Sequence, residues 1–200
     1  MSEKRQARFE MLRETSKERI ENAALELFAQ NGYGHTSISQ IAKAAGISKG
    51  LMYNYYESKE ALLQSVLKRG FEFGDKLMMS NNSLENSSPE DLLKTIVEAS
   101  FMEVKNNLIY WKLLMALAFQ EEVIKTLAPD IEQKKTAYLS IGKTIYSQLG
   151  YPNPEAQARL FGAVMDGVFM HYILTPNEYP LDDVKQLLIN NFCKIWTVNS

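Results

Sequence analysis

The segment 38–56 has the residue types and spacing of two short helices joined by a sharp turn. Gly46 can supply the positive φ that such a turn needs, because glycine has no Cβ to clash in that conformation. Ile47 is an apolar plug for the turn, and Ala42 and Ala45 are small enough to let two helices cross closely. The second helix then presents its first turn and outer face, which is the part of a recognition helix that enters a major groove.

The residues on that outer part of the second helix are Lys49, Gly50, Leu51, Tyr53 and Asn54. The same pattern is compatible with a second interpretation, a generic helical hairpin whose polar face is only solvated. The turn by itself leaves both interpretations open.

Capping residues and helix breakers divide the whole chain into helices. The predicted spans are 15–31, 37–45, 48–55, 58–79, 88–105, 108–119, 130–149, 155–174 and 182–197. Thr15 begins the first span with a capping box, and Pro129 is expected to break the chain before Asp130. The polar stretch 80–88 is expected to be a loop. No segment alternates apolar and polar residues over the length of a strand, so we predict an all-α fold of about nine helices.

The composition argues against several classes of protein. With 46% hydrophobic residues the chain can bury a core, and no apolar run reaches the roughly 18 residues of a membrane span. The charged N-terminus lacks the apolar core of a secretory signal, so we expect a cytoplasmic protein with no membrane partner. Residues 1–70 hold 11 Lys and Arg against 8 Asp and Glu, whereas residues 71–200 hold 11 against 16. A basic N-terminal part and an acidic remainder are typical of a nucleic-acid-binding domain joined to a domain that does not bind nucleic acid.

Catalytic and metal-binding patterns are absent from the sequence. The single Cys193 cannot form an intramolecular disulfide, and His35 and His171 have no further ligands at metal-binding spacing. We find no nucleophile and base pair and no glycine loop that could cradle a phosphate. We therefore expect no enzyme activity, no metal and no cofactor.

The string from Thr36 to Glu60 closely resembles the signature of the TetR/AcrR family of transcriptional repressors; it reads TSISQIAKAAGISKGLMYNYYESKE. The match extends back through residues 24–33 and covers about a quarter of the chain. The resemblance implies a three-helix DNA-binding domain in residues 1–57 and a larger helical domain for effector binding and dimerisation in residues 58–200. It also implies a homodimer that binds a near-palindromic operator in double-stranded DNA and is released by a small apolar or amphipathic molecule.

The resemblance further implies roles for individual residues. Thr36 and Ser37 would meet a phosphate near a helix N-terminus, where hydroxyls and helix amides suit an anion, and Lys59 would hold another phosphate. Lys49 would reach guanine or phosphate, and Tyr53 would touch the DNA backbone. With Gly50 at the groove edge and Leu51 and Asn54 as candidates for base contacts, the predicted DNA-binding set is Thr36, Ser37, Ser48, Lys49, Gly50, Leu51, Tyr53, Asn54 and Lys59.

Residues 1–14 form a basic arm before the first predicted helix, with Lys4, Arg5, Arg8 and Arg13. Such an arm can enter a minor groove. The alternative, which we favour, is a disordered and solvated tail.

Two C-terminal spans have the pattern of a helix–helix interface, because small residues let two helices approach closely. In the resembling family the last two long helices form a four-helix bundle across a two-fold axis. The predicted dimer interface consists of Ala156, Ala163, Gly167, Val184, Leu188, Asn191 and Ile195. The alternative is that both helices pack only within one chain.

Aromatic and methionine residues are dense between Phe71 and Tyr172, which favours an apolar effector pocket in a domain of this kind. The predicted pocket consists of Phe71, Phe101, Trp111, Met115, Tyr138, Phe161, Met165 and Phe169. Acidic residues such as Asp166 would also suit a lipophilic cation, and the sequence does not identify the effector. The remaining alternative is a DNA-binding protein whose C-terminal domain only dimerises.

Overall fold

The computed structural model describes residues 3–79 and 87–197, and within these ranges every regular element is a helix. The helices are α1 (Glu3–Asn31), α2 (Ile38–Ala44), α3 (Lys49–Met52), α4 (Lys59–Met79), α5 (Pro89–Asn106), α6 (Leu108–Ala118), α7 (Glu121–Gln148), α8 (Pro154–Leu174) and α9 (Leu181–Phe192). The all-α prediction is confirmed. Most of the expected loop at residues 80–88 lies outside the described residues.

The described residues divide into two compact units. The first contains residues up to Phe71 together with Leu113–Ala128, and the second contains Glu72–Lys112 together with residues from Pro129 onward. Helices α4, α6 and α7 each contribute to both units. Among the described residues no helix is long and apolar enough to cross a membrane.

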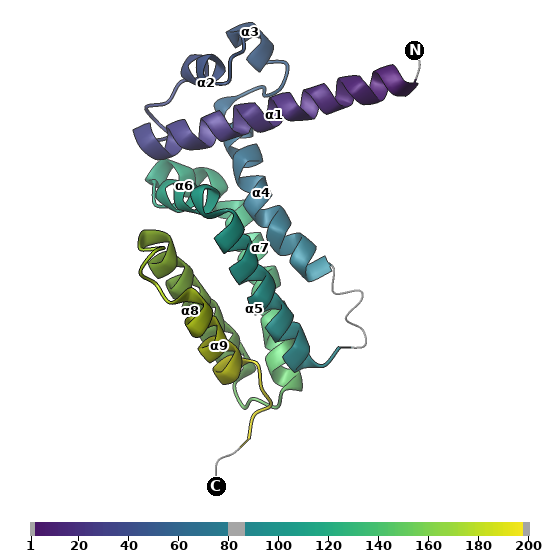
Figure 1. Ribbon diagram of the computed structural model, residues 1–200, viewed down its shortest axis with the longest axis vertical. Coiled ribbons are helices and arrows are strands. Elements are labelled where there is room, and N and C mark those ends of the chain that lie inside the picture. The colour runs from purple at the N-terminus through teal and green to yellow at the C-terminus, as the bar shows by residue number, and fades with distance from the viewer. Residues whose placement is uncertain (1–2, 80–86, 198–200) are drawn as a thin grey trace. The chain divides into compact units, whose positions relative to one another are not determined.

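The first unit is built around the C-terminal half of α1. Its apolar stripe, predicted from residue spacing, is buried at Ile20, Ala24 and Phe28, where α1 packs against α2 (Figure 1). The core is completed by fully buried side chains from α2, α3, α4, α6 and α7, namely Ile41, Met52, Leu62, Leu63, Leu117 and Val123. This core fixes the inner faces of α2 and α3 and leaves their outer faces at the surface.

The prediction that the first helix begins at Thr15 is wrong. Helix α1 begins at Glu3, and the hydroxyls of Thr15 and Ser16 donate to the carbonyls of Met11 and Leu12, four residues earlier. These hydroxyls are thus bonded within the helix rather than capping it. Neither glycine nor proline interrupts the preceding residues, so nothing stops the helix there. The disordered tail that we favoured for residues 1–14 is therefore wrong for residues 3–14, which are helical.

Three other predicted boundaries also differ. Helix α3 ends at Met52 and not at residue 55. Helix α7 passes through Pro129 without a break, because proline removes one backbone donor but the turns on either side supply the others. The last helix ends at Phe192 and not at Thr197; beyond it, the backbone N–H of Trp196 donates to the carbonyl of Leu149.

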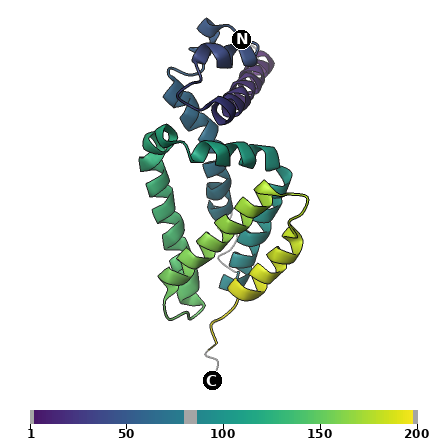
Figure 2. The same ribbon diagram turned by 90° about the vertical axis from the view of Figure 1, so that its left-hand side faces the viewer.

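The second unit packs α5, α7, α8 and α9 around a common core. The buried cluster consists of Leu93, Ile96, Ile145, Tyr146, Leu149, Tyr151 and Ala158, with the half-buried Cys193 against it. Helix α9 lies beside both α5 and α8, and α8 and α9 run side by side in Figure 1 and Figure 2. The lone cysteine is thus part of an apolar core, which also raises the pKa of its thiol to about 11.

Candidate functional site

The turn between α2 and α3 has the predicted geometry. Ser37 caps α2 in a capping box with Gln40, and the Ser48 hydroxyl accepts the backbone N–H of Leu51 at 3.1 Å to begin α3. Between them Gly46 adopts φ +70°, and the N–H of Ile47 donates to the carbonyl of Ala42 at 2.9 Å. These local bonds hold the two short helices in a helix-turn-helix.

The outer side of α3 is exposed while its inner side is buried. Met52 is fully buried, whereas Leu51 and Tyr53 are 40% and 49% exposed. The side chains of Lys49 and Asn54 also lie at the surface. The lysine of this short helix, and the tyrosine hydroxyl and asparagine of the turn that follows it, can donate to phosphates and to base edges.

The expectation that the Thr36 hydroxyl meets a phosphate is wrong. Thr36 is 2% exposed, and its hydroxyl lies 3.1 Å from the carbonyl oxygen of Leu27 and 2.9 Å from that of Gly32. The single hydroxyl proton is shared between these two carbonyls at the end of α1, so the hydroxyl is already used within the chain. Ser37, in contrast, is exposed.

Lys59, the first residue of α4, binds the loop between α1 and α2. Its Nζ donates to the carbonyls of Tyr33 (2.9 Å) and Thr36 (3.2 Å) and lies 4.3 Å from the centre of the Tyr33 ring. An ammonium group has three N–H donors, so one remains for a phosphate. The predicted phosphate contact of Lys59 stays a prediction, and its contacts to the loop are an additional role.

Gln120, between α6 and α7, holds the same loop from another side. Its Oε1 accepts the backbone N–H of Tyr33 at 2.6 Å, and its Nε2 donates to the carbonyl of Phe28 at 2.9 Å. Glu122 lies so close to Gly34 that a Cβ on Gly34 would clash with its carboxylate. Gln120 was not predicted from the sequence, because the residues that it joins lie about 90 positions away and no local pattern marks it.

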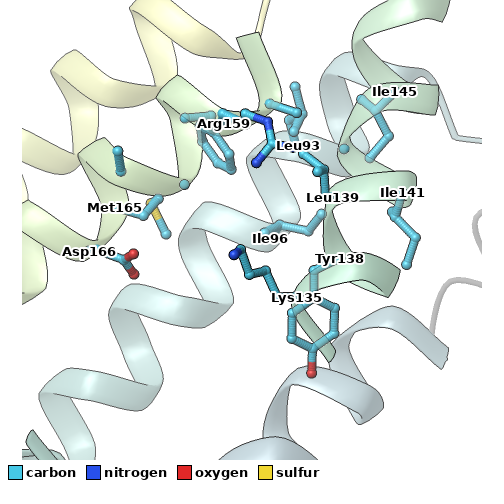
Figure 3. Close-up of a pocket in the computed structure, with 15 residues that line it drawn as sticks. Leu93, Ile96, Lys135, Tyr138, Leu139, Ile141, Ile145, Arg159, Met165 and Asp166 are labelled. Atoms are coloured by element: carbon cyan, nitrogen blue, oxygen red, sulfur yellow. The ribbon is translucent and has the colours of Figure 1, made fainter. Parts of the chain in front are cut away.

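A cleft of about 560 Å³ lies between α5, α7 and α8 in the second unit (Figure 3). Most of its lining is apolar, including Leu93, Ile96, Leu139, Ile141, Ile145, Ala158, Phe161 and Met165. Its polar lining residues are Lys135, Tyr138, Arg159 and Asp166. A volume of this size, with an apolar lining and few polar groups, is typical of small-molecule sites.

Three residues of the predicted pocket line this cleft, namely Tyr138, Phe161 and Met165. Others lie elsewhere: Phe101 and Phe169 pack on each other with ring centroids 5.1 Å apart, and Trp111 packs against Phe73 and Tyr110. Met115 belongs to the first unit, and the side chain of Phe71 lies outside the described part of the structure.

The charged groups of the cleft differ in their pairing. Arg159 binds Glu155 at 3.0 Å, and the ammonium of Lys135 lies 3.6 Å from the carboxylate of Glu132. Asp166 has no ion pair or hydrogen bond with any described residue, and partial desolvation in the cleft raises the pKa of its carboxyl group. Within residues 3–79 and 87–197 no group of metal-ligating side chains could hold a metal ion.

The predicted dimer residues divide into outward and inward positions. Ala156, Ala163 and Asn191 are exposed, and Gly167 and Val184 are half-buried. Ile195 is exposed but lies beyond the end of α9. Leu188 is 4% exposed, so its outward assignment is wrong: it packs within its own chain, and the neighbouring Leu187, 61% exposed, points outward. Leu160, Met170 and Leu174 extend the exposed apolar stripe along α8.

Comparisons with known proteins agree with this geometry. Residues 20–66 match the family model for bacterial regulatory proteins of the TetR family. The HTH-type transcriptional regulator BetI of Pseudomonas aeruginosa is 26% identical over 166 residues, which are 81% of this chain and 83% of that protein. YuxN of Bacillus subtilis, another HTH-type transcriptional regulator, is 58% identical over 48 residues, 24% of this chain and 16% of its own.

The fold has also been seen in solved structures. FadR of Bacillus subtilis, solved in complex with stearoyl-CoA, superposes with a TM-score of 0.67 at 21% identity, covering 90% of this chain and 98% of FadR. The family match begins at Ile20 and ends at Val66, so it spans the α2–α3 turn and the core beneath it. Residues 20–66 therefore carry the TetR-family helix-turn-helix domain, and the chain is similar to transcriptional regulators over about four-fifths of its length.

Proposed function

We propose that the protein is a repressor that binds a near-palindromic operator as a homodimer and leaves it when a small molecule occupies the cleft between α5, α7 and α8. DNA binding is assigned to residues 1–57, and effector binding and dimerisation to residues 58–200. Residues 58–71 and 113–128 pack with the DNA-binding part. A protein that binds a bacterial operator would act in the cytoplasm.

The exposed first turn of α3 is the observation that carries this proposal. Lys49 and Leu51 on α3, and Tyr53 and Asn54 in the turn directly after it, are exposed, and the buried Met52 and the Ser48 cap fix the position of this helix. Side chains presented by a fixed helix can read base edges, and the exposed Ser37 at the start of α2 can meet a phosphate.

A homodimer is supported by the apolar surface of α8 and α9. Leu160, Met170, Leu174 and Leu187 are exposed along these two helices, beside the small residues predicted for the interface. Several large apolar side chains exposed on two neighbouring helices are typical of a protein–protein interface. Two-fold symmetry of the protein would be matched by two half-sites in the operator.

A small apolar or amphipathic effector is supported by the lining of the cleft. Its walls are mainly aliphatic and aromatic, with a few polar groups to fix orientation. The structurally similar FadR was solved with stearoyl-CoA, an amphipathic molecule. Such a ligand would release DNA only if it binds the two conformations of the repressor with different affinities.

The proposal is tested by selecting bound sequences from random duplex DNA with the purified protein. We expect enrichment of a near-palindrome and loss of binding as salt rises, because phosphate contacts release counterions. A protein that enriches no sequence over random DNA would contradict operator binding.

The selection is then repeated with fatty acids, acyl thioesters, lipophilic cations and aromatic acids. A matched pair of variants tests the cleft. Gly162 lines it, and no atom lies within 4 Å of the position that a Cβ on this residue would take, so Gly162→Leu should fill the cleft and abolish release without weakening DNA binding. Ser140→Leu, on the exposed side of α7, should leave release unchanged. If Gly162→Leu still responds to a ligand as the wild type does, the ligand binds elsewhere.

A further inference from the structure

Tyr138 is shared between the cleft and helix α4. It lines the cleft from α7, and its hydroxyl donates to Oδ1 of Asp75 on α4 at 3.3 Å. Lys134, one turn earlier on α7, donates to the same Oδ1 at 2.6 Å and also contacts Oδ2. We call Asp75, Lys134 and Tyr138 the Asp75 cluster. All three belong to the second unit.

We propose that the Asp75 cluster is the contact through which occupancy of the cleft is passed to α4, with Tyr138 as its positioning residue. The inference rests on the proposed function, because it assigns a route to the release of DNA. A ligand that moves the Tyr138 ring withdraws one donor from the Asp75 carboxylate and loosens the connection between α7 and α4.

The chemistry of the cluster suits a contact that can be broken. Lys134 and Asp75 are each about one-third exposed, so water screens their ion pair and neither is locked in place. Burial, followed by the Asp75 carboxylate, raises the pKa of Tyr138 to about 12, so the hydroxyl keeps its proton at neutral pH. Tyr138 is therefore a constant donor to Asp75, and its bond is lost by displacement of the ring and not by titration.

Both helices of the cluster begin at residues that hold the loop between α1 and α2. Helix α4 is continuous from Asp75 back to Lys59, which donates to the carbonyls of Tyr33 and Thr36. Helix α7 begins directly after Gln120, which bonds to the backbone of Tyr33 and Phe28. The loop leads into α2, and α2 packs against α3. Each helix therefore runs without a break from the cluster to the end at which the loop before the helix-turn-helix is held.

The ion pair between Lys143 and Glu155 provides a comparison. It joins α7 to α8 at 3.5 Å on the surface of the same unit. Glu155 and Lys143 do not line the cleft, and α8 does not lead to the α1–α2 loop. If breaking an ion pair weakened DNA binding only by destabilising the second unit, breaking this pair would weaken DNA binding as well.

The test is operator affinity without any effector, measured by fluorescence anisotropy on the DNA recovered by selection. Tyr138→Phe removes the hydroxyl and keeps the ring in the cleft. We expect it to weaken operator binding about fivefold to tenfold, as the loss of one hydrogen bond to a charged group would. Lys143→Met should bind the operator as the wild type does.

A double-mutant cycle identifies the partner. Combining Tyr138→Phe with Asp75→Asn should weaken operator binding less than the product of the two single effects, because both changes break the same contact. Thermal unfolding and sedimentation are measured on each variant, so that loss of fold or of dimer is recognised. Additive effects would assign the role of Tyr138 to another contact and overturn the inference.

Two outcomes separate the inference from the proposed function. If the wild type binds its operator and Tyr138→Phe binds it equally well, even with a lower Tm, the cluster is only structural and the inference is overturned. If the wild type selects no operator at all, the proposed function fails, and the inference fails with it.

Discussion

The side-chain amide of Gln120 lies 2.6 Å from the backbone nitrogen of Tyr33, although 87 residues separate them in the sequence. The same amide donates to the carbonyl of Phe28 in the last turn of α1. One side chain from the α6–α7 connection thus forms hydrogen bonds with the backbone at the end of α1 and at the start of the loop that follows. Lys59 donates hydrogen bonds to two carbonyls of the same loop, those of Tyr33 and Thr36.

Gln120→Leu keeps the size of this side chain and removes its donor and acceptor. The N–H of Tyr33 loses its partner, so we expect the free energy of unfolding to fall by about 1–3 kcal/mol. Amide protons of residues 32–36 should exchange faster with solvent, as measured by hydrogen–deuterium exchange. Glu121→Gln, at the neighbouring exposed position, should change neither quantity. Unchanged exchange in residues 32–36 would contradict the role given to Gln120.

The local features of the DNA-binding part could be predicted from the sequence. Caps at Ser37 and Ser48 and the positive φ of Gly46 depend on neighbours within four residues, so the residue types alone indicate them. The failures at Thr15 and Pro129 have the opposite cause. Both residues permit either a boundary or a continuing helix, and the flanking turns decide between the two.

The cleft could be predicted only in part. Aromatic density located Tyr138, Phe161 and Met165, but it could not separate them from Phe101 and Phe169, which pack on each other. The density of aromatic residues does not indicate which face of a helix packs against which neighbouring helix. For the same reason the bonds of Gln120 and the Asp75 cluster, which join distant segments, leave no local pattern in the sequence.

Lys49→Ala is expected to weaken operator binding about tenfold and to reduce the slope of log affinity against log salt by about 1, because one phosphate is no longer neutralised. The side chain is exposed, so the far-ultraviolet circular dichroism should stay unchanged. Tyr53→Ala should weaken binding at all sequences alike if the tyrosine touches the backbone. Lys125→Ala, at an exposed position paired with Glu121, serves as the control. Equal affinities for Lys49→Ala and the wild type would exclude Lys49 from the interface.

Gly167→Arg is expected to convert the proposed dimer to a monomer. No atom lies within 4 Å of a Cβ built on Gly167, so the isolated chain should accept the side chain, whereas a close helix pair would not. Sedimentation velocity should show the monomer, and operator affinity should collapse because the two half-sites are read together. Leu187→Glu on α9 should act in the same direction, and Ser140→Arg on α7 should not. A Gly167→Arg protein that remains dimeric would place the interface elsewhere.

Asp166 should make the protein less stable at neutral pH than at acidic pH. Partial desolvation in the cleft raises the pKa of its carboxyl group, so the folded chain holds this proton more tightly than the unfolded chain does. The contribution is most favourable below the unfolded pKa of about 4 and is lost as pH rises through the folded pKa. Asp166→Asn removes the charge, so its free energy of unfolding should exceed that of the wild type at pH 7 and converge with it near pH 4.

Asp182 provides the control with the opposite sign. Its hydrogen bond and ion pair with Lys105, at 3.1 Å, lower the pKa of its carboxyl group. Stability from this group is present above the unfolded pKa and lost as pH falls through the folded pKa, so Asp182→Asn should lower stability at pH 7. Urea unfolding of both variants and the wild type between pH 4 and pH 8 measures the two effects together. If Asp166→Asn is no more stable than the wild type at pH 7, the Asp166 carboxylate is fully solvated and its pKa is not raised.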